Sequence, residues 1–287
     1  MQSHFLEKHH IILQRGHSLA ILLRLLLNRI QLCRLRIYKL FSGIHYPIVH
    51  YYAVCWNEER MLPFMFKHYE SSVEKFFIYD NYSDDSSENI ILAHPNTNIK
   101  KFSMDGEIND HVYQDIKNNC WKRSRGKADF VIVCDMDEFL YHPDLQSALS
   151  EMKRNGQTIV KPQGYNMYSS NEPAKGIPLT TQVPCGVRDQ WFDKCILFDP
   201  HSIVEINYKP GAHECHPVGR VVWNKNDFKL LHYKNIGLNS VLARKKQYSS
   251  RLSQENISKG FGTQYLEEEE RTIREFQENE QKATRII

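Results

Sequence analysis

The chain has 287 residues, of which 41% are hydrophobic and 25% are charged, as is usual for a globular protein. Its formal net charge is only +3, and the basic excess lies in residues 1–50, which hold seven lysines and arginines against one acid, Glu7. The rest of the chain is therefore weakly acidic, which excludes a nucleic-acid-binding protein by charge.

The seven cysteines are an odd number and form no C-x-x-C pair. His213, Cys215 and His216 lie too close together for a common zinc site. Free thiols in a reducing compartment are the simplest account, so we expect a cytoplasmic protein. The N-terminal segment described next leads us to expect that it is peripheral to the membrane. The alternative is a Golgi-type lumen, with an N-terminal anchor.

Residues 18–41 predict a helix with its apolar side chains on one face. That face consists of Leu19, Leu22, Leu23, Leu26, Leu27, Ile30, Ile37, Leu40 and Phe41. Arg24 interrupts the apolar run, so no clean span of about 20 apolar residues exists. One interpretation is a helix lying in the surface of an anionic membrane. A second is a helix packed on the rest of the fold with its arginines in solvent, and a third is a weak signal anchor.

After Pro47, strands are expected to alternate with helices. The expected strands are 48–55, 75–80, 98–103 and the apolar run that enters Asp135, and the expected helices begin at Asn57, at Asp85 or Ser86, and at residue 111. This order predicts an α/β fold with a mostly parallel sheet flanked by helices. Further helices are expected at 144–155, 240–252 and 264–281, and further short strands at 195–200, 202–208 and 228–234.

Polar residues stand at the ends of three of these strands: Asn57, Glu58, Asp80, Asp135 and Asp137. The carboxyl ends of parallel strands meet at one rim of the sheet, where ligands bind. We therefore expect these polar side chains to lie at that rim.

Asp135 and Asp137 are two residues apart at a strand end, so both can turn toward a single cation. Carboxylate oxygens suit Mg²⁺ or Mn²⁺, and open positions would let substrate phosphates complete the coordination. Glu138 either joins the ligands or turns inward and braces the loop. A calcium EF-hand does not fit, because Leu140 stands where that loop needs glycine. Solvated acids at a strand end are the remaining alternative.

Three segments in this order, "CWNEERMLPFMFKHY", "FFIYDNYSDDSS" and "ADFVIVCDMDEFLYH", resemble the GT-A glycosyltransferases. The nearest pattern is the family-2-like branch whose metal motif reads DxDEF, and the resemblance covers residues 48–145 well. It implies a GT-A fold and a nucleotide-sugar donor, UDP-linked. The loop glycine that this family has after its second strand is missing here.

The resemblance also implies roles for single residues. Asn57, Glu58 and Glu59 would lie beside the nucleotide, and Asp80 would read the uracil or ribose. Asp135 and Asp137 would hold the metal and the donor's diphosphate. A late histidine would add a third metal ligand, for which His232 is the best match and His213 the alternative.

An inverting transfer needs a carboxylate that takes a proton from the acceptor hydroxyl. Asp189 is the first choice for this base, and Asp193 and Glu214 are the alternatives. Trp191 is expected in the core rather than stacked on an acceptor sugar. Arg188, Lys194 and residues 244–246 are candidates for phosphate contacts.

The sequence thus predicts a metal-dependent glycosyltransferase of polysaccharide biosynthesis that moves a sugar to a hydroxyl of a glycan or lipid-linked acceptor. The rivals are a metal-dependent nucleotidyltransferase and an inactive scaffold of the same fold. Residues 1–45 are expected to form the basic N-terminal helix. Residues 46–287 are expected to form one domain, with the nucleotide-sugar half at 46–145 and the acceptor half at 146–287.

Overall fold

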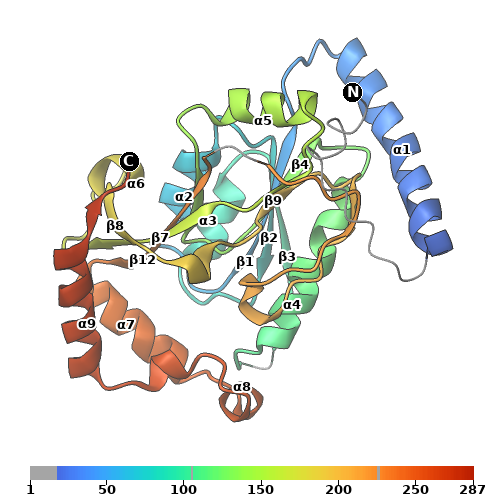
Figure 1. The fold of residues 1–287 in the computed structure, drawn as a ribbon. Helices are drawn as coiled ribbons and strands as arrows, with labels where there is room; N and C mark the ends of the chain where they lie inside the picture. Colours follow the sequence, from blue (N-terminus) through green and yellow to red (C-terminus); the bar gives the residue numbers. More distant parts are fainter. Residues whose placement is uncertain (1–17, 105, 225–226) are drawn as a thin grey trace, which may run out of the picture.

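A mixed sheet forms the centre of the protein in the computed structural model, which describes residues 18–104, 106–224 and 227–287 (Figure 1). Its strand order is β3 (Thr97–Lys101), β2 (Lys75–Asp80), β1 (Val49–Cys55), β4 (Phe130–Val133), β9 (Leu197–Phe198) and β6 (Ile159–Val160). The first four strands are parallel to one another, and β9 runs antiparallel to both of its neighbours. The predicted α/β class with a mostly parallel sheet is confirmed.

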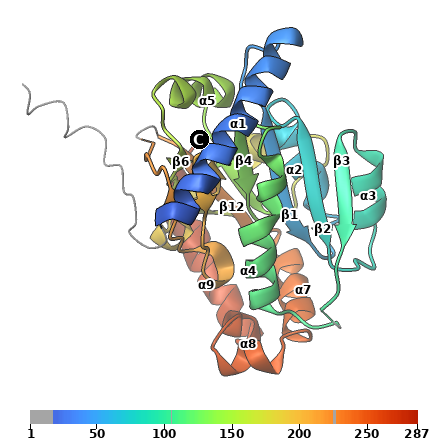
Figure 2. The ribbon, with the colours of Figure 1, turned by 90° about the vertical axis from the view of Figure 1, so that its right-hand side faces the viewer.

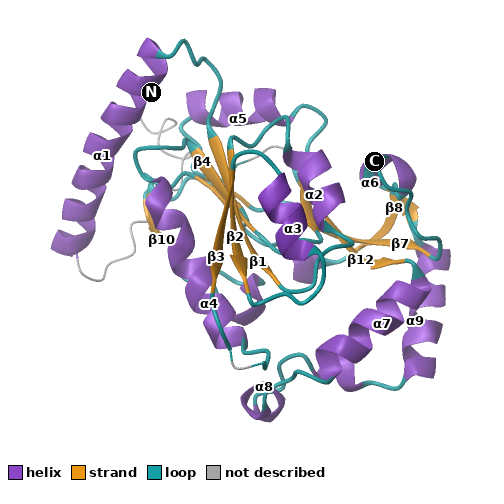
Figure 3. Cartoon of the chain, turned by 180° about the vertical axis from the view of Figure 1, so that it is seen from behind, coloured by secondary structure: helices purple, strands orange, loops and turns teal. Residues whose placement is uncertain are grey.

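Helices cover both faces of this sheet, as predicted (Figure 3). One face packs on α2 (Leu62–Tyr69), α3 (Ser87–Ala93) and α5 (Leu145–Arg154), and the other on α4 (Asp110–Asn119) and the 3₁₀ turn η1 (Cys120–Ser124). The strands supply both cores by alternation: Tyr51 lies in the first core and Tyr52 in the second.

A second sheet packs beside the first and carries the later half of the chain. Its strand order is β13 (Thr284–Arg285), β8 (Cys185–Arg188), β7 (Gln163–Ser169), β12 (Lys229–Ile236) and β5 (Glu138–Tyr141). β12 pairs with β7 in parallel and with β5 antiparallel, so His232 lies opposite both Asn166 and Glu138. A two-stranded sheet joins β10 (Ile203–Glu205) and β11 (Val218–Gly219).

The remaining elements are short helices and a C-terminal helical arm (Figure 2). They are α6 (Leu179–Gln182), α7 (Leu238–Ser249), α8 (Gln254–Ser258) and α9 (Glu269–Lys282), with the 3₁₀ turns η2 (Gln190–Phe192), η3 (Pro210–Ala212) and η4 (Thr263–Leu266). The helices predicted in this region are present, and α9 begins five residues later than expected.

The N-terminal helix is α1 (Ser18–Phe41), with the predicted bounds, while residues 1–17 of the expected N-terminal segment lie outside the described part. It packs on the body through the buried Asn28, Leu35 and Lys39. Its arginines are exposed, but so are all nine residues of the predicted apolar face. Helix α1 therefore packs on the body through the face opposite these nine residues. Within the described residues, no helix is both long enough and apolar enough to span a bilayer.

Candidate functional site

The loops after β1, β2 and β4 lie at one rim of the sheet. Parallel pairing places Cys55 beside Asp80 and Tyr52 beside Val133, so the three strands end close together. The predicted meeting of polar strand ends is therefore present in the structure.

Asn57 and Glu59 bind the loop that follows β2. The Asn57 amide donates to Asp84 at 2.6 Å, and the Asp84 backbone N–H donates back to the amide oxygen of Asn57 at 2.9 Å. The Glu59 carboxylate accepts from the backbone N–H of Ser86 at 3.0 Å. Asn57 has a φ of +52°, a left-handed conformation that asparagine tolerates. The sequence predicted that a helix begins at Asn57, and this prediction is wrong. Helix α2 begins only at Leu62, and Met61 is its N-cap residue.

Asp80 is fully buried and folds its own loop. Its two carboxylate oxygens accept from the Ser83 hydroxyl at 2.6 Å and from the Ser83 backbone N–H at 3.2 Å. These contacts give Asp80 a structural task, and recognition of uracil or ribose stays a prediction.

Glu58 faces the metal motif and not the β2 loop. Its carboxylate pairs with Arg244 of α7, whose guanidinium also donates to the carbonyl oxygens of Trp56 at 2.8 Å and Asn57 at 2.7 Å. Burial raises the pKa of Glu58 to about 7; Arg244 opposes the rise, and the carboxylates of Asp137 and Asp135 add to it. A carboxyl group with such a pKa can exchange a proton at neutral pH.

Asp135 is held by two buried lysines. The Lys117 ammonium lies 2.6 Å from one carboxylate oxygen and the Lys194 ammonium 3.7 Å from the other, with side-chain exposures of only 7% and 3%. Burial by itself raises the pKa of Asp135, but the two ammonium groups lower it below its ordinary value.

Glu138 turns inward and braces the loop, which decides between the two roles that the sequence left open. Its carboxylate pairs with Lys194 at 2.5 Å and accepts from the Asp135 backbone N–H at 3.2 Å. Lys194 therefore links the two carboxylates of the motif. It was a candidate for phosphate contact, whereas Lys117 lies in the last turn of α4 and carried no sequence signal.

Asp137 and His232 form the other half of the site. His232 Nε2 lies 3.4 Å from Asp137 Oδ2, and His232 Nδ1 lies 2.8 Å from the Asn166 amide oxygen. The Asn166 amide NH₂ donates in turn to the Asp189 carboxylate at 2.8 Å. Because a carboxylate can only accept, the amide orientation is fixed and Nδ1 of His232 carries the proton. In its neutral form, His232 presents the lone pair of Nε2 to the Asp137 carboxylate, and in its protonated form it pairs with that carboxylate.

Two acceptors that face each other call for a proton or a cation between them. Burial raises the pKa of Asp137, but positive charge on His232, together with Lys234 and Lys194, lowers it well below its ordinary value.

The arrangement of these side chains can be compared with the predicted metal site. Among the described residues, no group of three or more His, Cys, Asp and Glu side chains is arranged to hold a metal ion. Asp135 is engaged by lysines, which leaves Asp137 and His232 as the better candidate ligands, and metal binding by Asp135 stays a prediction. Such a pair fits a cation that keeps most of its coordination open for substrate phosphates and water. A histidine whose other ring nitrogen donates to a fixed acceptor is the usual metal-ligand arrangement.

The three candidate catalytic bases, Asp189, Asp193 and Glu214, differ in their hydrogen-bond partners and in their exposure to solvent. Asp189 accepts from the Trp191 backbone N–H at 2.9 Å with its second oxygen, so both of its oxygens have partners. Asp193 accepts from the Gly164 backbone N–H and from Arg188, both at 2.8 Å. Glu214 is exposed on the turn after η3. A role as base stays a prediction for all three.

Trp191 is not in the core, contrary to expectation, because it is 61% exposed. Its ring stacks on His213 with centroids 4.4 Å apart, and Phe192 stacks on His232 at 4.1 Å. Burial and the Lys194 ammonium lower the pKa of His213 to about 3, and its Nδ1 lies 2.8 Å from the Trp191 carbonyl oxygen. These rings line one flank of the site; metal binding by His213 stays a prediction.

Comparison with known proteins gives one informative relative. No protein-family model matches the chain. A glycosyltransferase family 92 protein of Ricinus communis is 30% identical over 115 residues, which is 37% of this chain and 20% of that protein. The chain thus matches about a fifth of the length of this relative. The similarity agrees with the glycosyltransferase prediction.

Solved structures add only a distant likeness. The S. aureus TarS 1–349 structure is 11% identical, covers 76% of this chain and 70% of its own, and has a TM-score of 0.41. The same protein in complex with UDP-GlcNAc is 9% identical, covers 71% and 66%, and has a TM-score of 0.40. These scores are too low to carry a functional argument.

Proposed function

We propose that the protein is a metal-dependent glycosyltransferase of the GT-A type, which transfers a sugar from a UDP-linked donor to a hydroxyl of a glycan or lipid-linked acceptor. The observation that carries the proposal is the pair of Asp137 and His232, held beside Asp135 at the strand-end rim. The partial similarity to a family 92 glycosyltransferase supports the same class of reaction.

Asp137 and His232 would hold Mn²⁺ or Mg²⁺. When bound, the ion supplies positive charge that stabilises the leaving diphosphate. Lys117 and Lys194 hold Asp135 in place and add two more positive charges at the same rim. Arg244 brings a further cation from α7 to the end of β1. Each of these three cations is paired with a carboxylate of the site, so the bound metal ion would supply the additional positive charge that a nucleotide diphosphate needs.

Glu58 is the carboxyl group best suited to exchange the acceptor's proton. Its pKa of about 7 matches the working range of a general base, whereas both oxygens of Asp189 are occupied. We therefore assign Asp189 a positioning role through Asn166 and His232, with Glu58 as the proton acceptor. Trp191 is 61% exposed and stacks on His213, so the solvent-exposed part of its ring could contact an acceptor sugar.

A screen of nucleotide sugars with Mn²⁺ tests the function. The wild type should hydrolyse or transfer one UDP-sugar, and Asp137→Ala should lose metal-stimulated turnover while keeping its fold. Transfer of a nucleotide in place of a sugar would identify a nucleotidyltransferase. Absence of Mn²⁺-dependent UDP binding in calorimetry would leave the scaffold as the better account.

The proposed location is the cytoplasm, at the membrane surface. All seven cysteines are free thiols in the structure, which suits a reducing compartment. A Golgi-type lumen is the alternative, and detection of disulfides in the protein from its native source would favour it.

A further inference from the structure

Helix α1 presents a continuous apolar surface to solvent. We call it the leucine face, and its members have exposed fractions from 45% to 86%: Leu19, Leu22, Leu23, Leu26, Leu27, Ile30, Ile37, Leu40 and Phe41. Single exposed leucines are common on soluble proteins, but a run of nine along one helix marks an interaction surface.

The leucine face cannot turn inward without breaking buried contacts on the other side of α1. The Asn28 amide donates to the His201 carbonyl oxygen at 3.1 Å, and the Lys39 ammonium lies 2.8 Å from the Asp129 carboxylate. Leu35 is buried in a small cluster with Ile48. These contacts fix the orientation of the helix on the body.

The charge on α1 is of one sign. Residues 18–41 contain four arginines and one lysine and no acid, and Arg24, Arg29, Arg34 and Arg36 are all exposed. A helix with an apolar face beside uncompensated basic residues matches the surface of an anionic bilayer, where apolar burial and attraction to lipid phosphates act together.

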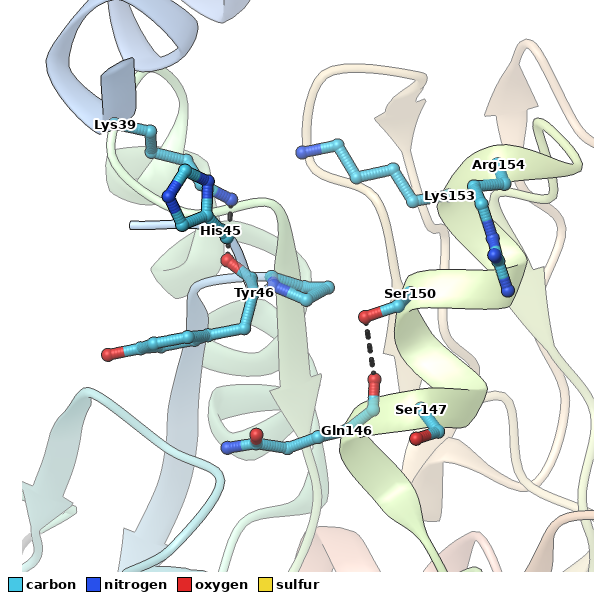
Figure 4. Close-up of a pocket in the computed structure, with 9 residues that line it drawn as sticks. Lys39, His45, Tyr46, Gln146, Ser147, Ser150, Lys153 and Arg154 are labelled. Atoms are coloured by element: carbon cyan, nitrogen blue, oxygen red, sulfur yellow. Dashed lines mark hydrogen bonds between the residues drawn. The ribbon is translucent and has the colours of Figure 1, made fainter. Parts of the chain in front are cut away.

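A basic cavity of about 710 Å³ lies at the C-terminal end of the same helix. Figure 4 shows one wall made by Lys39, His45 and Tyr46 and the opposite wall made by α5, which contributes Gln146, Ser147, Ser150, Lys153 and Arg154. Lys39 and Lys153 share one counter-ion, the buried Asp129, so the cavity keeps a positive excess. Cations and hydroxyl groups on facing walls suit a phosphate group.

We propose that the leucine face docks on an anionic lipid bilayer and that the basic cavity receives a lipid phosphate headgroup. Helix α1 connects the two features, because it carries the leucine face and, on its opposite side, Lys39, which lines the cavity. Membrane contact would then hold the protein by its N-terminal helix and by α5. This inference does not depend on sugar transfer, because no donor enters the experiment.

The experiment is flotation of the full chain with vesicles of phosphatidylcholine alone or mixed with phosphatidylglycerol. The wild type should float with the mixed vesicles and only weakly with the neutral ones. The triple variant Leu22→Gln, Leu26→Gln, Ile30→Gln should lower binding to mixed vesicles at least about 10-fold, because it removes apolar side chains that enter the bilayer.

A matched control places the same three substitutions at exposed positions elsewhere: Leu92→Gln, Leu266→Gln and Ile177→Gln. This variant should float like the wild type. All six side chains are exposed, so circular dichroism melts should show the fold unchanged. Equal flotation of the α1 variant and the wild type would overturn docking, as would failure of the wild type to float.

Two further experiments distinguish a lipid phosphate headgroup from free phosphate as the ligand of the cavity. Arg154→Gln should weaken flotation with mixed vesicles and leave the neutral vesicles unaffected; no change would remove the cavity from the proposal. Inorganic phosphate at the concentration of the lipid phosphate should not displace the protein from vesicles, and displacement would mean that free phosphate is the ligand. A dimer in light scattering that the α1 variant loses, without vesicle binding, would show that a second copy covers the leucine face.

Discussion

His232 Nε2 lies 3.4 Å from Asp137 Oδ2, although the two residues are 95 positions apart in the chain. The antiparallel register of β12 with β5 brings them together, because it sets His232 opposite Glu138, the neighbour of Asp137. The parallel register of β12 with β7 then places Asn166 behind the ring. The site is thus a row of side chains across adjacent strands, and its geometry follows from strand pairing.

Asp137→Asn should weaken Mn²⁺ binding at least about 100-fold, because it changes one of the two proposed protein ligands and loss of an outer partner alone costs about 10-fold to 100-fold. Calorimetric titration of Mn²⁺ in the presence of UDP measures the affinity directly. Asp115→Asn, an exposed aspartate on α4, is the control and should bind like the wild type. Equal Mn²⁺ affinity in Asp137→Asn and the control would remove Asp137 from the metal site.

Asp189→Asn should act at a distance, through the orientation of His232. The new amide NH₂ would face the Asn166 NH₂, so Asn166 would flip and withdraw its oxygen from His232 Nδ1. We expect Mn²⁺ affinity to fall about 10-fold to 100-fold. The pH profile of turnover at saturating metal should keep its shape.

A catalytic base at Asp189 would give the opposite pattern. Metal affinity would stay at the wild-type value, and turnover at saturating Mn²⁺ would fall about 100-fold to 10,000-fold. The two measurements therefore separate positioning from proton transfer.

The sequence predicted the first half of this fold well, because its strands are apolar and β-branched and its polar residues stand at strand ends. The positions of Asp135 and Asp137 at the rim follow from that pattern. The second sheet was not predicted, since β5 and β8 have only four residues each and the pairing of all its strands depends on contacts far apart in sequence. For the same reason the sequence could not show which histidine lies beside Asp137, and the register of β12 places His232 there.

The burial of lysines could not be predicted from the sequence. Lys117 lies between Ile116 and Asn118, and only the packing of α4 against the sheet shows that its ammonium reaches Asp135. The exposed face of α1 is a similar case. Periodicity identified the nine apolar residues correctly, but it could not show which side of the helix contacts the body.

Glu58 should make stability depend on pH. Its folded pKa of about 7 lies above the ordinary value of 4.5, so between these values the folded state binds more protons than the unfolded state. The free energy of unfolding should therefore fall as pH rises from 4.5 through 7, by up to about 3 kcal/mol from this group.

Urea denaturation at a series of pH values, without metal or nucleotide, measures this slope. Glu58→Gln should flatten it, because the glutamine has no proton to exchange. Glu59→Gln changes a neighbouring carboxylate that contacts the β2 loop, and it should keep the wild-type slope. An unaltered slope in Glu58→Gln would show that Glu58 does not titrate in this range.

Asp129→Ala should destabilise the attachment of α1. The Asp129 carboxylate accepts from Lys39 and from the Ile48 backbone N–H, both at 2.8 Å, and also pairs with Lys153. Removing it deprives the nearly buried Lys39 ammonium of its carboxylate partner, while the contact with the Tyr46 carbonyl oxygen at 2.6 Å remains. Loss of one partner of a buried ion pair costs about 3 kcal/mol.

The comparison is Glu70→Ala, which breaks the exposed pair with Lys67 and should cost under about 1 kcal/mol. Chemical denaturation gives both values, and limited proteolysis shows where the structure loosens. Cleavage in Asp129→Ala should begin between α1 and β1, because Lys39 and Ile48 flank that connection. Similar unfolding free energies for the two variants would show that the Asp129 cluster does not hold the helix to the body.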